Sequence, residues 1–197
     1  SRGATISLVV LVWPASSRTG PSAKKLGRVA ARAVDTAGGK ATFVDLRDHA
    51  MPLYDGDLEA AEGLPEAAVR LRKLVQQHDA LLFASPEYNA SIPAVLKNAI
   101  DWLSRPYAKE PGVSAFQGKV AGLLASSPGA LGGLRGLVHL RQVLMNVGVL
   151  VLTEQYALGG AADAFDADGA LQGDKQKAGV DKVVRALLRV GGALGRA

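Results

Sequence analysis

Apolar positions along the chain gather in five short runs, at residues 6–13, 41–46, 80–84, 120–125 and 149–152. The run 6–13 is almost continuous in apolar residues and partly β-branched, which is typical of a central parallel strand covered on both faces. The run 41–46 is shorter and more polar, as an outer strand would be. The pattern therefore predicts five strands of unequal burial.

Between these runs, apolar residues recur at helical spacing over residues 22–37, 64–77, 92–103, 134–147 and 180–194. Strictly alternating strands and helices predict an α/β fold with a parallel sheet and helices on both faces. Right-handed crossovers and five strands favour the doubly wound, flavodoxin-like order 2-1-3-4-5. Because no linker or repeat interrupts the alternation, we expect a single domain over residues 1–197, with 159–173 as its longest irregular stretch.

In a sheet of this order, ligands bind outside the carboxyl ends of the strands, where the strand order reverses. The loops after the first, third and fourth strands, residues 14–22, 85–91 and 126–133, are therefore expected to converge. Each has an unusual composition. Ser16, Arg18 and Ser22 give the first loop hydroxyls and a guanidinium beside a helix start, a combination that suits a phosphate. The alternative is a polar turn in which Ser22 caps the helix, since glycine-rich Walker and dinucleotide patterns are missing.

The second loop places Tyr88 and Asn89 at the same edge, with Ser91 expected as the helix N-cap and Pro93 in the first turn. An aromatic side chain with backbone amides can receive a planar heterocycle, although a rigid turn with Tyr88 packed on its own domain is an equal alternative. Glycines in the third loop allow either close approach to a ligand or a flexible connection.

Net charge and composition exclude several classes of function. The formal charge is +5, but the basic residues are scattered through helices without interleaved aromatics, which argues against nucleic-acid binding. There is no cysteine, so disulfides and thiol chemistry are excluded. The run 6–13 is too short for a bilayer and lacks a signal-peptide cleavage pattern, so no membrane association and a cytoplasmic location are expected.

The residues that a metal or an acid–base pair would need are dispersed. The three histidines belong to none of the candidate loops, and three aspartates near residue 165 lack the glycine and terminal glutamate of a calcium loop. We expect no metal. These residues are His49, His78, His139, Asp163, Asp166 and Asp168.

The stretch 86–106, PEYNASIPAVLKNAIDWLSRP, resembles the signature of the NAD(P)H-dependent FMN reductases, a family that includes quinone, chromate and azo-dye reductases. The resemblance extends more loosely over nearly the whole chain, including 126–133, 154–158 and 165–169. It implies FMN as cofactor, NADPH or NADH as co-substrate and a small-molecule acceptor such as a quinone, reduced in a ping-pong reaction. The flavin would carry the chemistry, with no catalytic side chain. A homodimer or homotetramer, with the helix after the signature at the interface, is also implied.

By this resemblance the cofactor-binding residues are Ser16, Arg18, Ser22, Pro86, Glu87, Tyr88, Asn89, Ser126, Gly129 and Gly132. The phosphate loop departs from the family pattern at three positions. Ala15 stands where the family has glycine, Lys24 where it often has asparagine, and Pro21 is an extra residue. Lys24 would add charge near the phosphate or point to solvent. These departures keep open a flavin-free interaction module, whereas the basic charge argues against a flavodoxin-type electron carrier.

Overall fold

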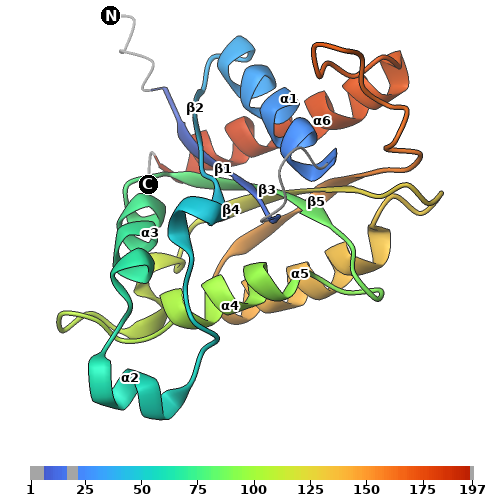
Figure 1. Ribbon diagram of the computed structural model, residues 1–197. Coiled ribbons are helices and arrows are strands. Elements are labelled where there is room, and N and C mark those ends of the chain that lie inside the picture. The colour runs from blue at the N-terminus through green and yellow to red at the C-terminus, as the bar shows by residue number, and fades with distance from the viewer. Residues whose placement is uncertain (1–6, 17–21, 196–197) are drawn as a thin grey trace, which may run out of the picture.

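Five parallel strands form one sheet in the order β2-β1-β3-β4-β5 in the computed structural model, which describes residues 7–16 and 22–195 (Figure 1). This is the order predicted from the sequence. Every pairing is parallel, and a register shift between Ala121 and Leu123 interrupts the β4–β5 pairing. The strands are β1 (Val9–Pro14), β2 (Lys40–Phe43), β3 (Ala80–Pro86), β4 (Val120–Ser126) and β5 (Leu150–Leu158).

Helices cover both faces of the sheet and divide the core into two layers. On one face α1 (Ser22–Thr36) and α6 (Asp174–Leu194) lie side by side, and on the other lie α3 (Glu66–Gln76), α4 (Ala94–Leu103) and α5 (Leu134–Asn146) (Figure 1). Alternate residues of β1 point into the two layers of the core. Val10 and Val12 pack under α1 and α6, while Leu11 and Trp13 pack under α3–α5. This alternation follows from the pleat of a strand buried on both faces.

Several boundaries differ from the sequence prediction. Strand β5 runs to Leu158 rather than residue 152, because its polar middle is only half-buried at the sheet edge. Helix α6 begins at Asp174, six residues before the predicted start, since its first turns are mostly exposed and lack an apolar stripe. Helix α2 (Gly56–Glu62) was not predicted at all. It buries no residue, and its start depends on Asp55, whose carboxylate accepts bonds from the N–H groups of Asp57 and Leu58.

Two 3₁₀ turns, Leu46–His49 and Gly112–Ala115, complete the described elements. Within residues 7–16 and 22–195, no helix has the length and apolarity needed to cross a membrane.

Candidate functional site

The described parts of the loops after β1, β3 and β4 lie together at the carboxyl edge of the sheet, as the strand order requires. Ser22 and Ser126 place their hydroxyl oxygens 3.0 Å apart, which joins the start of α1 to the end of β4. In the β3–β4 ladder Pro86 is the partner of Ser126, so the loop between β3 and α4, residues 87–93, begins directly beside it. This loop is called the ring-side loop, because it is the one predicted to receive a planar ring. Ser22 and Ser126, which are 104 positions apart in the chain, thus lie next to each other.

In the first loop, Ser16 is almost fully buried and Ser22 is the first residue of α1. The first N–H groups of a helix lack partners within it and carry partial positive charge, so this edge favours an anion. Arg18 and Pro21 lie outside the described residues.

Lys24 neither adds charge near the expected phosphate nor points to solvent, the two alternatives considered from the sequence. It is 5% exposed, and its Nζ lies 2.6 Å from Oδ2 of Asp45. Burial opposes ionisation of Asp45, but the bonds from Lys24 and from the N–H of Arg47 outweigh it and hold the pKa of Asp45 below its ordinary value. The Lys24 charge is therefore neutralised under the sheet edge instead of facing a ligand or solvent.

The ring-side loop contains a tight four-residue turn, residues 88–91. Tyr88 and Ser91 exchange two backbone hydrogen bonds of 3.0 Å, while Asn89 and Ala90 adopt φ of 51° and 62°. Ser91 is thus part of this turn and not the N-cap of α4, a position that Pro93 takes. Left-handed conformations at residues with a Cβ are costly and cluster at functional sites. Tyr88 is 44% exposed, and among the described residues the N–H groups of Asn89 and Ala90 have no acceptor.

Glu87 turns away from the open edge toward α5. Its carboxylate accepts hydrogen bonds from Nε of Arg135 at 2.8 Å, from Nη2 of Arg135 and from the N–H of Gly136 at 3.1 Å. Burial raises the pKa of Glu87, but these bonds outweigh the effect and leave the pKa below its usual range. Glu87 therefore fixes the ring-side loop to the first turn of α5.

His139 supplies a second link between the same loop and α5. Its Nδ1 lies 2.8 Å from Oγ of Ser91. Neither Arg135 nor His139 was singled out as a site residue from the sequence. Their spacing of four places both on one helix face, a signal that becomes informative only once α5 is known to lie beside the ring-side loop.

The two glycines predicted to approach a cofactor have different surroundings. Gly132 has φ of +62°, and an added Cβ would lie 2.6 Å from the backbone N of Gly159. Gly129 is exposed, and an added Cβ would meet only Oγ of Ser127, at 3.8 Å. Gly132 is therefore required for packing against the end of β5, while Gly129 leaves backbone open at the site.

Comparison with known proteins shows which family the chain belongs to. The family model of NADPH-dependent FMN reductases matches residues 8–163. The chain belongs to this family. Its members are oxidoreductases that use FMN and NAD(P)H, so the resemblance, the enzyme class and the cofactors inferred from the sequence are confirmed at family level.

Two curated relatives show the extent of the similarity. An NAD(P)H-dependent FMN reductase of Pseudomonas aeruginosa is 44% identical over 138 residues, covering 70% of this chain and 71% of the relative. A quinone reductase of Pseudomonas putida is 45% identical over 123 residues, covering 61% of this chain and 63% of the relative. The match thus spans less than two thirds of the second relative.

The solved structure of FerB, a flavoenzyme NAD(P)H:(acceptor) oxidoreductase from Paracoccus denitrificans, superposes with a TM-score of 0.76 at 31% identity. It covers 93% of this chain and 95% of that one. The flavodoxin-like α/β class predicted from the sequence is thereby confirmed.

The residues at the edge fit FMN in two respects. The start of α1 and the hydroxyls of Ser22 and Ser126 offer donors to a phosphate. The exposed Tyr88 ring and the unbonded N–H groups of the turn offer an aromatic surface and donors to the rim of a flavin ring. Among the described residues there is no group of three His, Asp or Glu side chains placed to hold a metal ion.

Proposed function

We propose that this protein reduces a small acceptor such as a quinone with electrons from NADPH or NADH, through FMN bound at the carboxyl edge of the sheet. The observation that carries the proposal is the meeting of Ser22 and Ser126 beside a strained turn that presents Tyr88 and two unbonded N–H groups. Bound FMN supplies hydride acceptance and electron transfer. The described residues supply binding and orientation.

The roles of the residues divide into two groups. The phosphate is bound by the start of α1 together with Ser16, Arg18, Ser22 and Ser126. Pro86, Tyr88, Asn89 and Gly129 line the ring, while Glu87 and Gly132 act indirectly by fixing the loops on which these residues lie. NADPH or NADH and the acceptor would react one after the other at the same site, which would give ping-pong kinetics.

The surface of α5 supports a homodimer or homotetramer. Leu134, Val138 and Met145 are 42%, 59% and 60% exposed and follow one side of the helix. A groove of about 580 Å³ lies between α4 and α5 and is lined by Ile92 and His139 among others. We propose that a second copy covers this face. Val138→Asp is expected to yield monomers by light scattering, and an unchanged oligomer would place the interface elsewhere.

The test of function uses the purified chain, FMN titration and stopped-flow NADPH and NADH oxidation with 1,4-benzoquinone. Loss of one hydroxyl bond to a charged phosphate costs about 1.5–3 kcal/mol, so Ser22→Ala and Ser126→Ala should each weaken FMN binding by roughly tenfold or more. Ser104→Ala is the matched control, because within the described part of the chain the Ser104 hydroxyl bonds only to the carbonyl of Asp101. Absence of FMN binding would favour the flavin-free module, and binding without nicotinamide oxidation would favour the electron carrier. A single domain and a cytoplasmic location stay predictions.

A further inference from the structure

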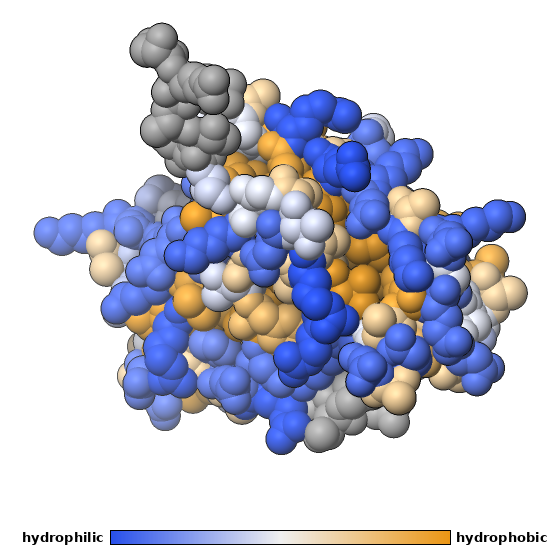
Figure 2. Space-filling view, turned by 90° about the horizontal axis from the view of Figure 1, so that it is seen from above, coloured by the Kyte–Doolittle hydropathy of each residue, from blue (hydrophilic) through white to orange (hydrophobic). Residues whose placement is uncertain are grey.

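The positive charge of the protein is concentrated on α1 and α6. Their exposed side chains include eight basic and three acidic residues, which give +5, the formal charge of the whole chain. Seen from above, this face shows hydrophilic side chains on either side of an apolar hollow (Figure 2). The basic residues are Lys25, Arg28, Arg32, Lys175, Lys177, Lys182, Arg185 and Arg189, and the acidic ones are Asp35, Asp174 and Asp181.

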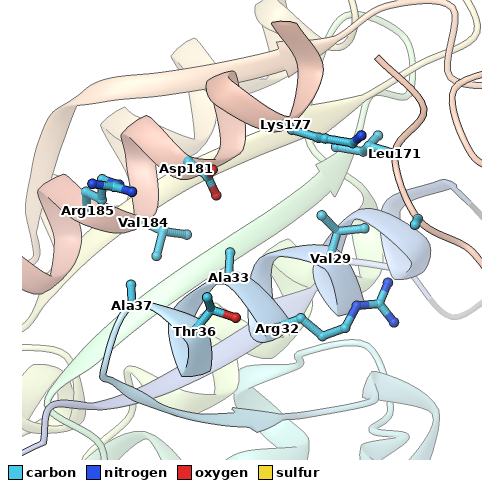
Figure 3. A pocket seen from close by; sticks show the side chains of 11 residues that line it. Val29, Arg32, Ala33, Thr36, Ala37, Leu171, Lys177, Asp181, Val184 and Arg185 are labelled. Atoms are coloured by element: carbon cyan, nitrogen blue, oxygen red, sulfur yellow. The ribbon is translucent and has the colours of Figure 1, made fainter. Parts of the chain in front are cut away.

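The hollow is a groove of about 280 Å³ between the two helices (Figure 3). Val29 and Ala33 of α1 and Val184 of α6 give it an apolar lining, while Arg32, Lys177 and Arg185 bring cations from both helices. This volume lies at the lower limit of small-molecule sites, about 300 Å³, so the groove suits only a compact molecule. Val29 lies about two helical turns from Ser22. The groove is thus separate from the proposed FMN site.

The three cations of the groove are poorly neutralised. Among the residues that the structure describes, Arg32 donates only to the carbonyl of Gly169, at 3.3 Å. Lys177 lies 3.5 Å from Asp174, whose side chain is fully exposed, so this ion pair is weak. Within the described residues Arg185 has no ion pair. Asp181 also lines the groove and offsets one of the three positive charges, so the groove keeps a net positive charge.

Arg32 of α1 and Lys177 of α6 lie toward the same end of the groove, and Arg185 lies at its other end (Figure 3). Like charges on neighbouring helices repel, and an anion bound between Arg32 and Lys177 would reduce that repulsion. The apolar lining adds a requirement, because a bare inorganic anion would leave it exposed to water. We propose that the α1–α6 groove binds a small organic phosphate, with the phosphate between Arg32 and Lys177 and the apolar part against Val29, Ala33 and Val184.

Phenyl phosphate is the probe, because it combines one phosphate with one compact apolar ring. It is titrated by calorimetry into protein saturated with FMN, so that the flavin site is blocked. In the Arg32→Gln/Lys177→Gln double variant, loss of charged hydrogen bonds should raise Kd roughly tenfold or more. Lys182→Gln, on the same helix but outside the groove, should leave Kd unchanged. Ala33→Leu should weaken phenyl phosphate more than inorganic phosphate, because it fills only the apolar part.

Thermal unfolding of each variant shows whether it is folded, and 15N chemical shifts of the wild type locate the probe independently of any variant. Shifts confined to α1 and α6 would support the proposal. Equal Kd in the double variant and the wild type would overturn it, as would shifts at the turn 88–91. Binding to phosphatidylglycerol vesicles without binding of phenyl phosphate would also overturn it, because the face would then recognise a lipid surface. If FMN itself does not bind, the unsaturated protein gives the same test, so the two proposals fail separately.

Discussion

Replacement of Glu87 tests whether the ring-side loop depends on its attachment to α5. The carboxylate is 7% exposed and bonds to the buried N–H of Gly136 and to Arg135, which is 59% exposed. A charged hydrogen bond to a buried donor contributes about 1.5–3 kcal/mol. The pair with the exposed arginine adds at most about 1 kcal/mol, because solvent screens it. Glu87→Ala should therefore lower the free energy of unfolding by roughly 2–3 kcal/mol.

Glu87→Gln is the discriminating variant, because its amide oxygen can still accept the Gly136 bond while the charge is lost. We expect a loss of about 1 kcal/mol and a weaker affinity for FMN, since the turn 88–91 is then held less firmly. The assays are urea unfolding and fluorescence titration with FMN.

The pH dependence of the same comparison follows from the lowered pKa of Glu87. A carboxyl with a depressed pKa contributes stability above its unfolded value of about 4.3, and this contribution is lost as the pH falls through the folded pKa. The difference between wild type and Glu87→Gln should therefore be full at pH 7 and shrink below about pH 4. Equal stability and equal FMN affinity of wild type and Glu87→Gln at pH 7 would show that the charge of Glu87 does not hold the turn 88–91.

Three further predictions concern other parts of the chain. Arg72 is 1% exposed and donates to four carbonyls, a carboxylate and a hydroxyl between residues 103 and 114, so Arg72→Ala should cost about 3–5 kcal/mol in urea unfolding. Arg70→Ala, on the same helix but exposed, should cost less than about 0.5 kcal/mol, and similar losses would contradict the anchoring role. Gly132→Ala should lower the unfolding temperature sharply, whereas Gly129→Ala should leave it unchanged and weaken only FMN binding; the reverse order would show that the two roles are misassigned. Arg18→Ala, outside the described residues, should raise the Kd for FMN roughly tenfold or more without a change in stability, and an unaltered Kd would exclude a phosphate contact.

The sheet was predictable because its signal is local and strong. Strands β1 and β3 are buried on both faces and therefore read as apolar runs, and the alternation with helices left few topologies to consider. Helix α2 was not predictable from periodicity, since it buries nothing. The length of β5 was also hidden, because only part of this edge strand is buried.

The site was predictable to the level of loops but not of side-chain roles. Ser22 at the start of α1 and Ser126 at the end of β4 meet as expected, because topology alone brings these positions together. The pairing of Lys24 with Asp45 joins residues 21 positions apart, and that of Glu87 with Arg135 joins residues 48 apart. Such partners depend on how the helices pack on the sheet, which no local pattern encodes.

Stopped-flow absorbance tests most directly whether the protein is a flavin-dependent reductase. The FMN-loaded protein is mixed with NADPH or NADH in the absence of an acceptor. We expect bleaching of the flavin band with one equivalent of nicotinamide, followed by recovery of the band when 1,4-benzoquinone is added. A band that persists in the presence of excess NADPH and NADH would contradict the proposed reductase.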